Sequence, residues 1–285
     1  ERRGLQLPVA LARESTALVH LAQGRHADAL RGLESAAEAY AALSLTHYQA
    51  IAERHQADAL LALRLWREAL SLLDRVGQRL QALDLPDEQA AALLQKARVQ
   101  ALQGQHRPAV RALDEADALF LRQGRDTARA GVALSRAELA LAEGRIDEAT
   151  ALCREAGTNF TKAGLRAERA LADELRARAA LRAGRLDEAG RAWMSLRERA
   201  RRLQLAPLQL ACAIGLGQVA RRRGRQALAR RRLDDALKHL ELQRRALPGD
   251  ELRSAFLRDG LLAYDERLAL ALDVADARGA LALLE

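Results

Sequence analysis

The chain repeats itself every 40 residues, and this period restricts its fold more than any other feature. A short turn-like segment recurs between apolar stretches, first as Leu-Ala-Gln-Gly-Arg at 21–25 and last as Arg-Arg-Gly-Arg at 222–225. The turn positions of the six units are Gly24, Arg64, Gly104, Gly144, Gly184 and Gly224. A fixed period of this length over six units is typical of a solenoid of stacked helical units.

Each unit places residues of similar size at the same distances from its turn. Seven residues before it stand Ala17, Ala57, Ala97, Ala137, Ala177 and Gly217. Five residues after it stand Ala29, Ala69, Ala109, Ala149, Ala189 and Ala229. Nine residues after it stand Leu33, Leu73, Leu113, Cys153, Trp193 and Leu233, and apolar positions follow at twelve and sixteen. These offsets step by three and four, so they mark one face of a helix.

The pattern predicts two antiparallel helices of about 16–19 residues in each unit, with small residues where the two backbones approach. The turn glycine is expected to end the first helix, because glycine tolerates the left-handed conformation found at helix C-termini. Connections between units are predicted near Leu45, Leu85, Gly124, Gly164 and Leu205. A single hairpin cannot bury such a stripe, so neighbouring hairpins must stack into one core.

Composition agrees with an all-α chain. Aromatic residues make up 3% of the 285 residues and only five are proline, while 49% are hydrophobic. This excludes disordered, collagenous and disulfide-rich classes. Cys153 and Cys212 are too few for a disulfide framework and favour a reducing, cytoplasmic location. The longest uncharged segment, 203–220, contains polar residues and fits the repeat, so a buried helix is preferred to a membrane span.

The spacing of a small residue, a glycine turn and an alanine resembles the tetratricopeptide repeat over 7–243. The resemblance implies a right-handed superhelical solenoid that binds proteins. The period is 40 residues rather than 34, the early tryptophan is absent, and most repeats lack the closing proline. These departures resemble the longer-helix variants of large bacterial signalling proteins.

The repeat phase breaks after Arg245, which divides the chain into six repeats over 1–245 and an irregular seventh hairpin over 246–285. Pro248 and Gly249 predict a turn, Asp250 is a candidate helix N-cap, and Ala275 followed by Ala280 repeats the turn spacing. The segment 252–285 resembles the last repeats before the caspase-like CHAT peptidase domain of bacterial proteins. The resemblance implies that a peptidase follows in a longer protein, although its His/Cys dyad has no counterpart here.

No catalytic constellation is found. Cys153 occupies a packing position, and Cys212 has no adjacent histidine in sequence. His47 and His55 could share a helix face but lack a third metal ligand. The acidic pairs at 147–148 and 187–188 fall at helix starts, where they complement the helix dipole. We therefore predict no enzyme activity, no metal and no cofactor for this region.

Partner-binding residues are predicted on the first helix of each hairpin, which lines the concave face in related solenoids. The candidate residues, five of them at one position of consecutive repeats, are Arg54, Asp58, Arg98, Glu138, Arg178 and Gln218. Solvation of the groove is the alternative role for these side chains. The expected function is a scaffold or sensor arm that docks a protein partner and regulates a C-terminal CHAT peptidase.

A basic segment offers a second candidate surface. Residues 197–245 contain 14 Lys or Arg and 4 Asp or Glu, a net charge of +10 in a chain of net charge +8. Its expected outward-facing patch consists of Arg221, Arg222, Arg223, Arg225, Arg230, Arg231 and Arg232. An acidic protein partner or neighbouring domain, simple solvation, and nucleic acid are the alternatives, although stacking aromatics for nucleic acid are nearly absent. The alternative function is a nucleic-acid-responsive transcriptional or ATPase regulator.

Overall fold

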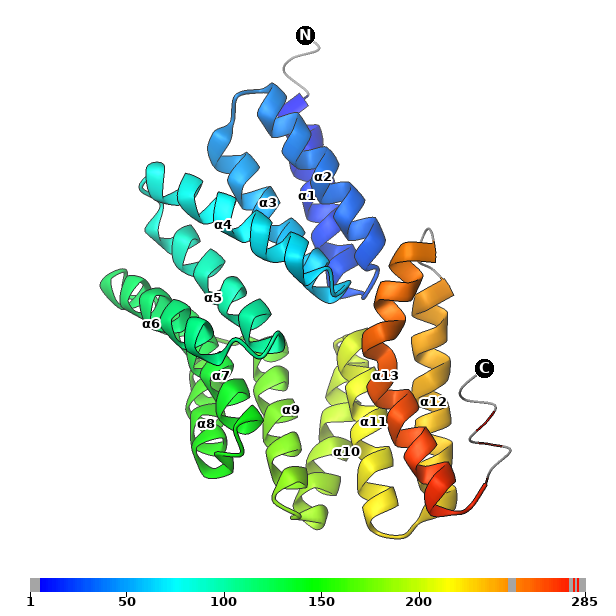
Figure 1. Cartoon of the computed structure of the whole chain (residues 1–285). Helices are drawn as coiled ribbons and strands as arrows, with labels where there is room; N and C mark the ends of the chain where they lie inside the picture. The colour runs from blue at the N-terminus through cyan, green and yellow to red at the C-terminus, as the bar shows by residue number, and fades with distance from the viewer. Residues whose placement is uncertain (1–5, 246–249, 277–278, 280, 282–285) are drawn as a thin grey trace. The chain divides into compact units, whose positions relative to one another are not determined.

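The computed structural model describes residues 6–245, 250–276, 279 and 281, and these residues form helices without a strand. Eleven consecutive helices have 17 residues each and are separated by three-residue links: α1 (Gln6–Ala22), α2 (His26–Ala42), α3 (Thr46–Ala62), α4 (Trp66–Ala82), α5 (Pro86–Leu102), α6 (His106–Arg122), α7 (Asp126–Ala142), α8 (Ile146–Lys162), α9 (Arg166–Arg182), α10 (Leu186–Arg202) and α11 (Ala206–Arg222). Two longer helices follow, α12 (Gln226–Arg245) and α13 (Asp250–Asp273) (Figure 1). The all-α class and the helix length predicted from the repeat are confirmed.

Every link between α1 and α12 uses the same left-handed turn. Gly24 has φ 77°, and the link between hairpins uses Ser44 with φ 57°. Arg64 adopts φ 62°, so it takes the glycine conformation at the one turn within a hairpin where glycine is missing. At the first turn the Arg25 N–H donates to the His20 carbonyl, a closure that satisfies the end of the preceding helix. Both sets of predicted turns are therefore confirmed.

The chain forms two compact units, 1–143 and 144–285. Within each unit, consecutive helices pack against each other, and the first helices of successive hairpins also touch. In the N-terminal unit these are α1, α3, α5 and α7, and in the C-terminal unit α9, α11 and α13. First helices therefore form one layer within each unit.

The buried positions are those that the repeat predicts. Leu33, Leu73, Leu113, Cys153, Trp193 and Leu233 are at most 2% exposed, and Ala57, Ala97, Ala137 and Ala177 at most 1%. The two helices of a hairpin approach each other closely. A Cβ added to Gly217 on α11 would lie 2.7 Å from the Leu233 side chain on α12. The small residues are thus required by contact between helices.

The regular spacing ends at α12, which has 20 residues, and α13 has 24. Ala275 follows α13 with φ 54°, so the turn expected there is present. The predicted turn at Pro248 and Gly249 and the position of Ala280 lie outside the described residues. The uncharged segment 203–220 contains most of α11, whose Leu208 and Cys212 are buried, as expected of a packed helix. Among the described helices, none has the length and apolar character needed to span a bilayer.

Candidate partner-binding site

All six predicted partner-binding residues lie on first helices. In the N-terminal unit Arg54 and Asp58 lie on α3, Arg98 on α5 and Glu138 on α7. Three of these, Arg54, Asp58 and Arg98, are half-buried and form what we call the charged row. The charged row spans two adjacent first helices, so the repeat pattern correctly placed these residues in one layer.

Asp58 is the centre of the charged row. Its carboxylate accepts a hydrogen bond from Gln95 of α5 and is attracted by the positive charges of Arg54 and Arg98. Burial raises the pKa of the Asp58 carboxyl, and the two arginines only partly oppose that rise. Ionisation of Asp58 therefore lowers the stability of the folded state. Ionisable groups with such shifted pKa values are common at binding sites.

The two arginines of the charged row also contact neighbouring helices. The Arg54 Nε donates to Glu88 Oε2 of α5 at 3.1 Å, and its Nη2 lies 2.9 Å from Nε2 of His55. The Arg98 Nε donates to Ser135 Oγ of α7 at 3.1 Å. These bonds hold the two guanidinium groups in place, so the row is ordered before any partner arrives.

A buried acid that the sequence reasoning missed extends this network to α1. Glu14 is 8% exposed, accepts a hydrogen bond from the Tyr40 hydroxyl at 2.8 Å, and lies 3.0 Å from Nδ1 of His55. Because Arg54 can only donate, His55 Nε2 must accept and Nδ1 must carry the proton toward Glu14. The repeat carried no consistent signal for this residue, because the position of Glu14 holds Arg54, Leu94, Leu134, Glu174 and Ile214 in later units.

The remaining predicted residues differ in exposure. Glu138 is exposed and has no ion-pair or hydrogen-bond partner among the described residues. In the C-terminal unit Arg178 is exposed and lies 3.7 Å from Glu174 on its own helix. Gln218 is half-buried and donates to Glu266 of α13 at 3.0 Å. Glu138 and Arg178 are thus the members most accessible to a partner.

The expectation of a continuous outward-facing basic patch is wrong for Arg221 and Arg223, which are half-buried and paired, whereas Arg222 is exposed. Arg221 binds Glu266 at 3.0 Å and Asp273 at 2.6 Å, both on α13. Arg222 donates to the carbonyl of Leu181 at 2.6 Å, and Arg223 pairs with Asp187 of α10. The physical reason is that stacking brings acids and carbonyl groups from other hairpins against these guanidinium groups.

The other members of the basic patch are less constrained. Arg225 and Arg231 are exposed, and Arg232 is half-buried. Arg230 lies 3.8 Å from Asp234 and 3.9 Å from Asp276, at an exposed site where such pairs add little stability. The positive surface of this segment is therefore interrupted.

Neither cysteine has the environment of a reactive thiol. Neither forms a disulfide and both are buried, and burial raises the pKa of the Cys212 thiol to about 12. Burial also lowers the pKa of His26 to about 4, which keeps its ring neutral at pH 7. Within the described part of the chain, no three His, Cys, Asp or Glu side chains group as metal ligands would.

The molecule is therefore an all-α repeat protein with the fold of tetratricopeptide-like helical hairpins. No protein-family model matches the sequence, and no curated protein sequence matches it. Solved structures do match. Aspartyl phosphate phosphatase F from Bacillus subtilis aligns with a TM-score of 0.64 and 15% identity, over 82% of this chain and 60% of the phosphatase.

Two further structures share the fold. A Rap protein complexed with Competence and Sporulation Factor aligns with a TM-score of 0.62 and 14% identity, over 91% of this chain and 74% of the Rap protein. A signal transduction ATPase with numerous domains and a tetratricopeptide repeat sensor, from Pyrococcus horikoshii, aligns with a TM-score of 0.52 and 16% identity. The alignment covers 88% of this chain and 39% of the ATPase chain.

The Asp58→Asn variant is expected to melt at a higher temperature than the wild type at about pH 7. Because the carboxyl pKa is higher in the folded state, protonated Asp58 contributes to stability, and this stabilising contribution is lost as the pH rises through the folded pKa. The gain from asparagine should therefore vanish at about pH 3, where Asp58 is protonated. Thermal unfolding followed by circular dichroism measures both values.

The matched control for this prediction is Glu115→Gln on α6. Glu115 is exposed and unpaired among the described residues, so the melting temperature should stay the same at both pH values. An Asp58→Asn variant less stable than the wild type at about pH 7 would contradict the stated cost of the charge.

Proposed function

We propose that this region binds a protein partner through the first-helix layer of its hairpins and serves a regulatory role. The observation that carries the proposal is Asp58, a half-buried carboxylate with a raised pKa that lies among Arg54 and Arg98. A layer built only for packing would hold an apolar residue there. The shared fold with the Rap protein, which is complexed with a signalling factor, supports this proposal.

The proposal extends in three directions that the sequence suggests. We propose that the partner is an acidic protein or a neighbouring domain. We also propose that the protein acts in the cytoplasm, because its two buried cysteines form no disulfide. We also propose, from the resemblance of 252–285, that binding controls a caspase-like CHAT peptidase in the full-length protein. Control of a nucleic-acid-responsive or ATPase module is the second candidate, and the likeness to the signal transduction ATPase favours it.

Reversing the charge of an exposed first-helix residue should change partner binding. Arg178→Glu is expected to reduce the acidic partner captured from an extract of the source cells by about fivefold or more, because like charges slow association, and Glu138→Arg is expected to increase it. Quantitative mass spectrometry of proteins captured by the wild type and by each variant gives the measurement. Both positions are exposed, so the fold should be retained.

Matched reversals on second helices serve as controls. Glu115→Arg on α6 and Arg191→Glu on α10 change the same charges at exposed positions outside the first-helix layer. A protein retained by both controls and lost by Arg178→Glu is the partner. Equal loss from Arg178→Glu and Arg191→Glu would show that general charge, and not this layer, determines capture.

A further inference from the structure

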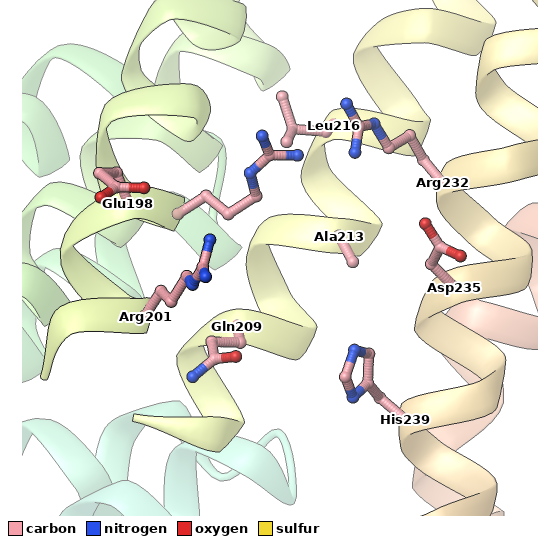
Figure 2. Close-up of a pocket in the computed structure, with 9 residues that line it drawn as sticks. Glu198, Arg201, Gln209, Ala213, Leu216, Arg232, Asp235 and His239 are labelled. Atoms are coloured by element: carbon pink, nitrogen blue, oxygen red, sulfur yellow. The ribbon is translucent and has the colours of Figure 1, made fainter. Parts of the chain in front are cut away.

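A pocket of about 230 Å³ lies in the C-terminal unit between α10, α11 and α12. Figure 2 shows Glu198 and Arg201 of α10 on one side, Arg232, Asp235 and His239 of α12 on the other, and α11 between them. Its lining residues come from two successive hairpins. The pocket is separate from the charged row, which belongs to the N-terminal unit.

Three arginines line this pocket without forming an ion pair among the described residues. Arg197, Arg201 and Arg232 have no ion-pair or hydrogen-bond partner within the part of the chain that the structure describes. Arg221 and Arg223 of the same unit, by contrast, are bound to acids from other helices. Burial, followed by repulsion from Arg197 and Arg231, lowers the pKa of Arg232. The pocket therefore holds more cations than the acids that line it can pair.

The acids of the pocket are too few to balance these charges. Glu198 is already paired with Arg202 at 3.1 Å, which leaves Asp235 to oppose the three unpaired arginines. Together with Arg202, the three arginines supply four positive charges, and Glu198 and Asp235 supply two negative charges. A net charge of two positive units therefore remains. A ligand with two negative charges would neutralise the site, whereas a single carboxylate would not.

We propose that this pocket binds a phosphate monoester. A phosphate monoester carries a charge of about −1.5 to −2 at pH 7, and its oxygens accept the paired donors that guanidinium groups present. Ala213 and Leu216 of α11 give the lining an apolar part, which suits the organic group of the ester. A small molecule and a phosphorylated protein segment are the two possible carriers of the ester, and both present the same group to the arginines.

Isothermal titration of the whole chain tests the site with phenyl phosphate. Benzenesulfonate has a similar shape but one negative charge, so it should bind much more weakly. Arg201→Gln and Arg232→Gln are each expected to weaken phenyl phosphate binding by about tenfold or more, since each removes a charge-assisted hydrogen bond. Arg191→Gln, an exposed arginine of α10 outside the pocket, should change affinity by less than about twofold.

A capped pentapeptide with a central phosphoserine between alanines distinguishes the two sources. Tighter binding of the peptide than of phenyl phosphate assigns the site to a phosphorylated protein, and the reverse order assigns it to a small phosphate ester. Equal binding of benzenesulfonate and phenyl phosphate by the wild type, or no binding of either, would overturn the proposal without recourse to any variant. No residue of the charged row takes part, so this failure would leave the proposed partner binding intact.

Discussion

The Trp193→Ala variant is expected to lower the free energy of unfolding of the C-terminal unit by about 3–5 kcal/mol, the usual loss for deleting a large buried aromatic side chain. Trp193 is 1% exposed and packs in a core that includes Ala177, Leu196 and Cys212. Its indole N–H has no partner among the described residues, so the loss comes from packing and not from a hydrogen bond. Urea denaturation followed by circular dichroism measures it.

Two further variants separate packing from general damage. Trp193→Leu should cost less than Trp193→Ala, because leucine occupies this position in four other repeats. Gly215→Leu added to Trp193→Ala should restore part of the stability, since Leu175 stands at the position of Gly215 in the preceding repeat. A Trp193→Ala variant as stable as the wild type would show that this core is wrongly assigned.

The Glu14→Ala variant is expected to destabilise the N-terminal unit by about 2–4 kcal/mol, because the Tyr40 hydroxyl and His55 Nδ1 lose their shared acceptor. Tyr40 is fully buried, so its hydroxyl cannot turn to water instead. Glu14→Gln keeps one acceptor oxygen and should cost less. Trp66 fluorescence in a Trp193→Phe background reports the unfolding of this unit, because the chain has only two tryptophans.

The same variant should change the response to acid. Burial alone would raise the pKa of the Glu14 carboxyl, but the bonds from His55 and Tyr40 outweigh it and hold the pKa below its ordinary value of 4.5. A lowered carboxyl pKa gives stability that is present above pH 4.5 and lost as the pH falls through the folded pKa. Glu14→Ala should thus show a weaker loss of stability below pH 4.5, and an unchanged acid response would contradict this role.

His26 contributes a separate acid response that both proteins share. Its pKa is lowered from 6.5 to about 4, so the fold loses stability as the pH falls between these values. Because His26 is present in the wild type and in Glu14→Ala, its contribution cancels in their difference. The comparison therefore isolates Glu14.

The sequence determined the helices, their links and the faces that they bury. The reason is local. Apolar residues that recur every three or four positions lie on one face of an α-helix, and a turn residue at a fixed interval ends each helix. Arg64 illustrates the strength of this pattern, because it adopts the left-handed conformation without being glycine. Arg54, Asp58 and Arg98 were likewise placed in one layer by their register alone.

The tertiary structure decided which side chains meet across different hairpins. A Cβ on Gly215 of α11 would lie 2.6 Å from Cζ2 of Trp193, so one small residue accommodates a ring from the preceding hairpin. Asp187 and Asp273 form ion pairs with arginines of the basic patch, which the order of residues along the chain did not predict. Arg201 and Arg232 form no ion pair within the described residues. A period fixes the direction in which a side chain points from its helix, but the partner that it meets depends on how the hairpins stack.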